Sequence, residues 1–176
     1  TDPKVTPPPR IEDIELRKPR IRPPAALAAL CTEDRWERAT HTYGKNLRDT
    51  VRAFQGDFSN PPDQVALPRT EADVAALLSW CSDERIVAIP YGGGSSVVGG
   101  VEVPLDDRYR GAVSIDLKHL NQVLEIDRTS RAANIQAGVY GPHLEDQLRP
   151  HGLTLRHFPQ SSEFSTLGGW VATRSG

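Results

Sequence analysis

The sequence predicts an α+β fold, in which a small βαβ unit precedes an antiparallel unit. Short β-branched segments flank a helical pattern at 71–82, which is typical of a strand–helix–strand unit. After residue 112 the apolar residues alternate with polar ones, as they do in strands that have one wet face. A glycine-rich segment at 90–100 joins the two halves.

The composition allows one domain or part of a larger one. The chain has 176 residues and a net charge of −2, which gives no electrostatic reason to expect nucleic acid or an anionic membrane as a partner. No apolar run approaches the ~20 residues of a membrane span, and no secretory signal is visible. Cys31 and Cys81 lack metal-site spacing and indicate buried thiols in a reducing compartment. We therefore expect an intracellular location, in the cytoplasm or at a membrane surface.

Residues 1–24 are rich in proline with interleaved charges, which predicts an extended arm docked on a partner domain and not a core element. Residues 25–60 form a predicted N-terminal helical segment. Within it, residues 25–30 are a short helix candidate, and Thr32 is the expected cap of the next helix. By composition, residues 43–49 and 56–63 are expected to be loops.

The βαβ unit begins with a short strand at 64–68. Thr70 and Asp73 predict a capping box at the start of the following helix. One apolar stripe follows, at the positions Val74, Leu77, Leu78 and Cys81. The helix leads to a strand at 86–89, which Pro90 is expected to end because proline cannot donate to a ladder.

Beyond the glycine-rich segment we expect three strands, at 113–117, 123–127 and 133–137, that form an antiparallel meander. Pro142 then opens a helix, in which Leu144 and Leu148 share one face. Gly152 is expected to end this helix.

The run Pro90-Tyr91-Gly92-Gly93-Gly94-Ser95-Ser96-Val97-Val98-Gly99-Gly100 carries the first functional signal. Successive free N–H groups in such a turn form an anion-binding concavity, so phosphate is the first ligand to consider. A Walker A loop is excluded because it needs Lys and then Ser or Thr after its last glycine, and neither follows Gly99. A Rossmann loop is excluded because it needs glycine or alanine where Val97 stands, and because the residues that follow are poor helix formers. The sequence predicts a phosphate cradle between β segments; a glycine-rich hairpin without a ligand is the alternative.

A second segment, residues 159–170, is too rich in glycine and hydroxyl groups for a regular element. Its hydroxyls can donate to phosphate or sugar oxygens, and Arg174 offers a guanidinium to a phosphate. Two such loops that converge would hold a dinucleotide without a covalent link. An ordinary serine-rich turn is the alternative.

These segments resemble the FAD-binding domain of the vanillyl-alcohol oxidase (PCMH-type) flavoprotein superfamily, most closely the alkyldihydroxyacetonephosphate synthase family and its bacterial relatives. The run Glu163-Phe164-Ser165-Thr166 before Gly-Gly-Trp is the most diagnostic part. Residues 17–27, 43–45 and 61–63 also fit. The resemblance implies FAD as cofactor, a PCMH-type fold, and an FAD-binding domain at 61–176 that is incomplete at its C-terminus.

The resemblance also implies which residues contact FAD. Amides of the first segment would wrap the pyrophosphate, the second segment would line the cofactor toward the isoalloxazine, and a third would continue that contact. These residues are Tyr91, Gly92, Gly93, Gly94, Ser95, Ser96 and Val97, then Pro159, Gln160, Ser161, Ser162, Glu163, Phe164 and Ser165, then Ala172, Thr173, Arg174 and Ser175. Gly94 stands where members with covalent FAD have a histidine, so non-covalent FAD is expected.

The implied reaction exchanges the acyl group of acyl-dihydroxyacetone phosphate for a long-chain alcohol, a step of ether lipid synthesis without net redox change. The alternative is an FAD-dependent oxidase or dehydrogenase of 2-hydroxy acids such as D-lactate or glycolate, and a non-catalytic module that uses the proline-rich arm is a third reading. No catalytic side chain is assigned, because that role belongs to a C-terminal substrate domain expected beyond this chain. A small-molecule or lipid substrate would bind through that domain. Contact with a membrane surface and a homodimer stay open; nucleic acid is not expected.

The five histidines, at positions 41, 119, 143, 151 and 157, show no metal-ligand spacing, so solvated or capping roles are favoured and no metal is expected. His157 precedes the second segment directly and could approach the flavin.

Overall fold

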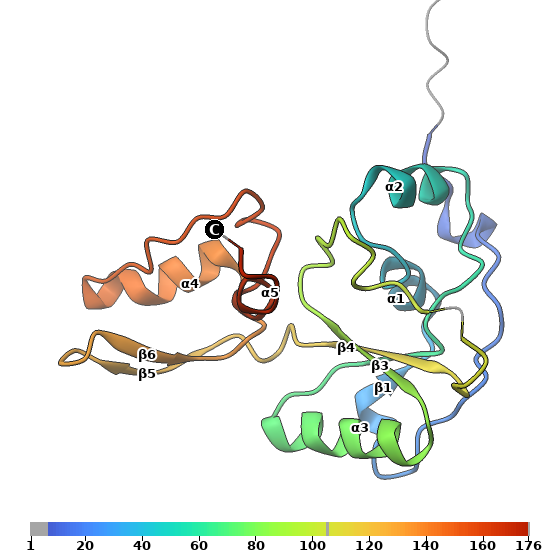
Figure 1. The fold of residues 1–176 in the computed structure, drawn as a ribbon, viewed down its shortest axis with the longest axis horizontal. Coiled ribbons are helices and arrows are strands. Elements are labelled where there is room, and N and C mark those ends of the chain that lie inside the picture. The colour runs from blue at the N-terminus through green and yellow to red at the C-terminus, as the bar shows by residue number, and fades with distance from the viewer. Residues whose placement is uncertain (1–6, 105, 176) are drawn as a thin grey trace, which may run out of the picture.

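The computed structural model describes residues 7–104 and 106–175, and it has the predicted α+β fold in two units (Figure 1). The larger unit holds a four-stranded mixed sheet in the order β1-β2-β4-β3, and the smaller one holds the antiparallel pair β5-β6. The strands are β1 (Cys31–Thr32), β2 (Gln64–Ala66), β3 (Val87–Tyr91), β4 (Ala112–Asp116), β5 (Val123–Asp127) and β6 (Ala132–Ile135). The predictions made for residues 1–6 and 176 lie outside the described residues.

The predicted βαβ unit is present as β2, α3 (Glu71–Asp83) and β3. Both strands run parallel to β4, which lies between them. The capping box of Thr70 and Asp73 is confirmed. Leu77 and Cys81 are buried against the sheet. Leu78 is 46% exposed, because one step along the helix from Leu77 rotates its side chain toward solvent. Trp80 takes its place in the apolar stripe.

The prediction of a three-stranded meander is wrong in its first strand. β4 lies inside the parallel sheet, and all five of its residues are buried, including Ser114 and Asp116. Alternation predicts a wet face only where one face meets water, and here α3 and the loops of the larger unit cover both faces. β5 and β6 do form the expected antiparallel hairpin.

Pro90 does not end its strand, as was predicted, but lies within β3 opposite Ile115. β3 is an edge strand. The amide of Val87 and the carbonyl of Tyr91 bond toward β4, so the two-residue period turns the Pro90 nitrogen to the open edge. At that position no ladder hydrogen bond is lost.

The described part of the proline-rich arm contributes to the core, and the expectation that it does not is wrong. Ile14 and Ile21 are buried, and Ile21 packs in the cluster that α3 and the sheet share. Asp63, also buried, bonds to the side chains of Arg17 and Arg20 and fixes the arm beside β2.

Side-chain caps set the N-terminal helices and differ from the predicted positions. α1 (Arg35–Thr40) is capped by Asp34 and not by Thr32, which lies in β1. α2 (Leu47–Phe54) is capped by Asn46, so the loop predicted at 43–49 ends earlier. Two short 3₁₀ turns, η1 (Ile11–Asp13) and η2 (Ala28–Leu30), precede them, and η2 is all that forms of the helix predicted at 25–30.

The smaller unit packs its helices on the β5–β6 hairpin. α4 (Gly141–Leu148) begins beside Pro142, and η3 (Arg149–His151) ends at Gly152, as predicted. α5 (Leu167–Thr173) starts inside the segment predicted to be irregular, because Thr166 caps it by accepting from the Gly169 amide. Leu144, Leu148 and Trp170 form the core of this unit.

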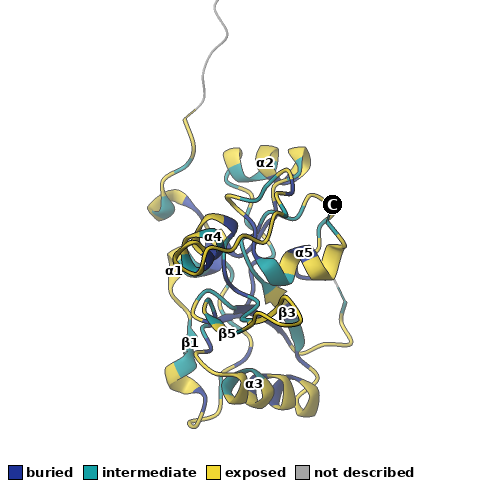
Figure 2. Cartoon of the chain, turned by 90° about the vertical axis from the view of Figure 1, so that its left-hand side faces the viewer, coloured by how far each residue is buried: buried dark blue, intermediate teal, exposed yellow. Residues whose placement is uncertain are grey.

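Figure 2 shows the buried residues along the strands and on the inner sides of the helices, while the outer sides of α2 and α3 are exposed. No helix in the described part of the chain has the length and apolar character needed to cross a membrane.

Candidate cofactor site

The glycine loop, residues 92–100, follows β3 directly and contains no helix. Tyr91 ends β3 and lies opposite Asp116, which ends β4. Ligands of open α/β sheets bind at the carboxyl ends of parallel strands. The sheet therefore places the loop at its ligand-binding end, on the side where the smaller unit lies (Figure 1).

The second loop, residues 159–166, lies against the glycine loop. A Cβ added to Gly92 would overlap the hydroxyl of Thr166, and one added to Gly93 would overlap the carbonyl oxygen of Phe164. Only hydrogen atoms fit at these two positions, so the backbones meet without an intervening side chain. The two segments singled out in the sequence thus form one continuous surface.

Gly94 turns the loop back over the Tyr91 side chain. Its φ is +64°, and a Cβ there would overlap the Tyr91 phenol. A side chain at this position is excluded both by the left-handed backbone and by the aromatic ring beneath it. The place at which a covalently attaching histidine would stand is therefore closed in this structure.

The amides of the glycine loop are available for a ligand. None of the N–H groups of residues 92–97 donates to an acceptor in residues 7–104 or 106–175. Ser96 acts as an acceptor: its carbonyl takes the Lys45 amide at 2.7 Å, and its hydroxyl takes the Gly100 amide at 2.9 Å. The hydrogen bonds to Ser96 thus fix the loop, while its free amides fit an anionic group such as a pyrophosphate.

The second loop is held by its own hydroxyl groups. Ser165 is buried, and its hydroxyl donates to the Ser161 carbonyl at 2.7 Å and accepts from the Trp170 indole at 2.6 Å. Phe164 is 68% exposed. Of the remaining predicted residues of this loop, Pro159 is buried, Ser161 and Ser162 are half-buried, and Gln160 and Glu163 are exposed. Ser165 therefore shapes the loop, and its exposed neighbours remain available to a ligand.

The third predicted segment lies at the far end of α5. Ala172 and Thr173 belong to that helix, and Arg174 is its C-cap with φ of +53°. The Thr173 hydroxyl bonds to the Gly169 carbonyl and to the Ser175 hydroxyl, both at 2.8 Å. Helical residues 167–171 separate this segment from the second loop, which amounts to about 9 Å along the helix axis.

His157 and the two thiols have structural positions. The half-buried His157 ring packs edge-on against Trp170, with 5.4 Å between ring centroids. Burial raises the pKa of Cys81 to about 11, and burial and the neighbouring Cys81 raise that of Cys31 to about 11. Both cysteines are therefore protonated at neutral pH. No group of His, Cys, Asp and Glu side chains suited to a metal ion occurs in the part of the chain that the structure describes.

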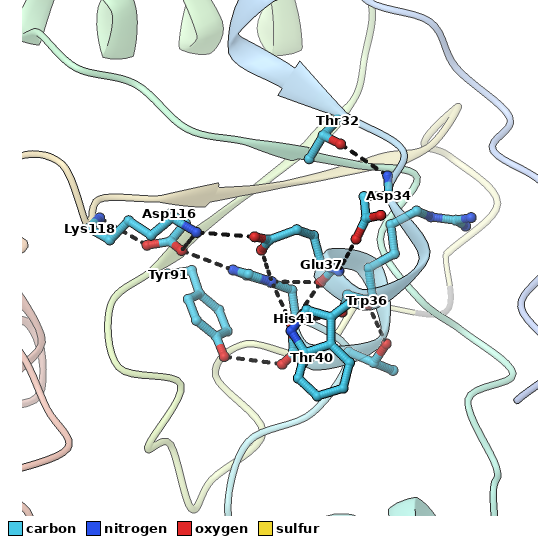
Figure 3. A network of polar contacts seen from close by, with 11 residues as sticks. Thr32, Asp34, Trp36, Glu37, Thr40, His41, Tyr91, Asp116 and Lys118 are labelled. Atoms are coloured by element: carbon cyan, nitrogen blue, oxygen red, sulfur yellow. Dashed lines mark hydrogen bonds and ion pairs between the residues drawn. The ribbon is translucent and has the colours of Figure 1, made fainter. Parts of the chain in front are cut away.

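A buried polar network beneath the glycine loop was missed (Figure 3). His41 is 4% exposed, whereas a solvated or capping role was predicted. Its Nε2 lies 3.2 Å from Asp116 Oδ2, and its ring contacts that of Tyr91 with 4.1 Å between centroids and a tilt of 43°. The sequence carries one signal for this cluster, a charged residue at the carboxyl end of the apolar segment 112–115.

The same network changes the electrostatics of Tyr91. Burial, together with the Asp116 carboxylate, raises the pKa of Tyr91 to about 12. The phenol therefore stays neutral and donates its proton to the Thr40 carbonyl at 3.2 Å. The hydrogen bond to Thr40 ties the Tyr91 side chain to α1, and the glycine loop lies against the same ring at Gly94.

The chain is similar in sequence to known flavoproteins. A family model described as FAD binding domain matches residues 62–176. Alkyldihydroxyacetonephosphate synthase of Dictyostelium discoideum is 46% identical over 143 residues, which cover 81% of this chain and 23% of that protein. Glycolate oxidase subunit GlcD of Bacillus subtilis (strain 168) is 32% identical over 119 residues, which cover 68% of this chain and 24% of that protein.

A solved structure of an alkyldihydroxyacetonephosphate synthase matches this fold with a TM-score of 0.90 and 41% identity, covering 97% of this chain and 34% of that chain. The chain therefore spans about a quarter to a third of the length of these relatives. The family model covers well over half of the chain, and the loops and amides described above agree with it. The chain belongs to the FAD binding domain family, and its cofactor is FAD.

Proposed function

We propose that residues 92–97 and 159–165 hold FAD non-covalently in the cofactor-binding part of an acyl-dihydroxyacetone-phosphate enzyme, which exchanges the acyl group for a long-chain alcohol. The contact of Gly92 and Gly93 with the second loop carries the cofactor part of this proposal. The similarity to named synthases supports the reaction. Contact of Ala172, Thr173, Arg174 and Ser175 with the cofactor is also part of the proposal.

When bound, FAD supplies a ring system that can exchange electrons or carry a substrate fragment, and the protein supplies position and electrostatics. The free amides of residues 92–97 bind the pyrophosphate in this proposal. The closed position at Gly94 supports attachment without a covalent bond. Substrate residues and acid–base groups are proposed to lie in the length that the relatives have beyond this chain.

The similarity to a glycolate oxidase subunit favours a second candidate, the oxidation of a 2-hydroxy acid. The two candidates share the cofactor loops. They differ in what happens to the flavin, since only the oxidation leaves it reduced.

We expect the 176-residue chain to bind FAD and to lose affinity when a methyl group is placed between the loops. Gly93→Ala should raise the dissociation constant about tenfold or more, because its Cβ meets backbone and one loop must move. Gly169→Ala is the matched control, since its Cβ has ordinary contacts. Titration followed by flavin fluorescence measures both, and equal affinities would contradict the proposed site. Acid precipitation should release all flavin into the supernatant.

The reaction is tested on the polypeptide at its full encoded length, loaded with FAD. The proposal expects labelled long-chain alcohol to enter acyl-dihydroxyacetone phosphate with release of the fatty acid. Anaerobic bleaching of the flavin by D-lactate or glycolate, without alcohol exchange, would replace the first candidate by the second. A full-length protein that stays colourless with added FAD would rule out both.

A further inference from the structure

We infer that His41 and Asp116 are positioning residues for the cofactor: they hold the Tyr91 ring over which the glycine loop turns, and thereby set the affinity for FAD. This inference rests on the proposed cofactor site. It adds a function for residues that neither loop contains.

The first step is the fixed orientation of the His41 ring (Figure 3). Nδ1 lies 2.7 Å from the carbonyl oxygen of Glu37, and Nε2 lies 3.2 Å from Asp116 Oδ2. Both neighbours are oxygen acceptors, so a ring N–H directed at either of them makes a hydrogen bond. Lys118 Nζ lies 3.5 Å from Asp116 and 3.3 Å from Glu37, which balances the two carboxylates. The imidazole is therefore held from both sides.

The second step joins this ring to Tyr91. The Tyr91 ring lies against His41, its hydroxyl bonds to Thr40, and its backbone is paired with Asp116 across β3 and β4. Helix α1 and the sheet thus hold the phenol from three directions. A shift of the imidazole or of the Asp116 carboxylate would move the phenol with it.

The third step joins Tyr91 to the loop. Gly94 passes so close to the phenol that no Cβ fits between them. The turn at Gly94 therefore follows the surface of the ring, and the direction of the neighbouring amides depends on where the ring stands. Because a pyrophosphate must meet several amides together, a small displacement weakens several hydrogen bonds simultaneously.

The network reaches the second loop as well. Burial and the Asp116 carboxylate raise the pKa of Tyr140. Tyr140 forms a backbone bridge with Thr166, and Thr166 contacts Gly92. Thr166 thus joins the Tyr140 backbone to the glycine loop, and the Asp116 carboxylate raises the pKa of both Tyr91 and Tyr140.

A buried pair of polar side chains contributes little net stability compared with apolar side chains of the same volume. His41 and Asp116 therefore contribute mainly by orienting the loops, which apolar side chains at these positions would not do. A core residue remote from the loops supplies the matched control: Leu77 is a fully buried residue of α3, and it belongs to a different core cluster from the one against which Tyr91 packs.

The test compares FAD affinity with stability in the 176-residue chain. His41→Leu and Asp116→Asn should each raise the FAD dissociation constant about tenfold, the loss expected for a charge-assisted hydrogen bond. Leu77→Ala should lower the unfolding midpoint at least as much and change the dissociation constant less than about twofold. Affinities are measured well below each midpoint, and the absorption spectrum of bound FAD is recorded. Unchanged affinity and spectrum in His41→Leu and Asp116→Asn would overturn the inference.

Tyr91 provides a second comparison should the His41 variant not fold. Tyr91→Leu removes the ring over which the glycine loop turns and should raise the dissociation constant for FAD about tenfold. Unchanged affinity of this variant would overturn the inference. Failure of the unchanged chain to bind FAD would overturn the proposed function and the inference together, whereas binding that ignores His41 and Asp116 overturns only the inference.

Discussion

Asp63 shows how a single residue fixes a segment far from it in sequence. Its carboxylate is fully buried and accepts from Arg17 Nη1 at 2.5 Å, Arg20 Nη2 at 2.8 Å and the Ala112 amide at 2.8 Å. Burial alone would raise the pKa of Asp63, but the hydrogen bonds from Arg20 and Arg17 outweigh it and hold the pKa well below its usual range. The folded chain therefore depends on the ionised form.

The pH dependence of stability follows from this depressed pKa. A carboxyl whose pKa is lower in the folded state stabilises the fold fully above its unfolded pKa, and the stabilisation is lost as the pH falls below that value. We expect the unfolding midpoint of the chain to drop steeply below about pH 4, and Asp63→Asn to flatten this acid limb. At neutral pH the same variant should lose about 3 kcal/mol.

Thermal unfolding followed by circular dichroism from pH 2 to pH 7 measures this effect. Asp106→Asn is the control: Arg108 holds the pKa of Asp106 at about 2, but the guanidinium of Arg108 is exposed to solvent, so removal of this pair should change the curve little. Parallel acid limbs for Asp63→Asn and the unchanged chain would contradict the assignment.

Among the elements, those specified by local signals could be predicted and those specified by distant neighbours could not. The capping box and apolar stripe of α3 lie within one helix, so the sequence contains all that defines it. The position of β4 depends on being covered from both sides by other segments, and the alternation of 113–117 does not contain that information. The cap of α2 at Asn46 was a local signal that was overlooked.

The capping box of α3 gives a prediction at this scale. Thr70→Ala should destabilise the chain by about 1 kcal/mol, because the Asp73 amide loses its acceptor at the helix start. Ser79→Ala, at an exposed position of the same helix, is the control and should change stability by less than about 0.5 kcal/mol. Urea unfolding measures both, and equal midpoints would argue against the cap.

The candidate site was predictable in its two loops and unpredictable in what supports them. Glycine and hydroxyl content marked residues 90–100 and 159–166, and the resemblance joined them to FAD. His41 gave no such signal, because an isolated histidine is far more often solvated than buried. Its partner Asp116 is 75 positions away in sequence, and only the packing of α1 against the sheet brings them together.

At the scale of the whole molecule, the arm is part of the folded unit. Ile21 is 5% exposed in the core cluster, so Ile21→Ala should cost about 2–4 kcal/mol and make the arm cleavable by proteases under native conditions. Leu124→Ala, at a residue that is 53% exposed on β5, is the control and should have little effect. A variant of Ile21 with the stability and protease resistance of the unchanged chain would show that the arm is not part of the core.

Pro90 has a consequence for association between molecules. A sheet edge with a full row of N–H and C=O groups can recruit a strand from another chain, which is a common route to aggregation. At the β3 edge Pro90 interrupts that row, and at the opposite edge β1 is only two residues long. Pro90, which was expected to end the strand, therefore hinders the pairing of another chain's strand with the β3 edge, next to the cofactor loop.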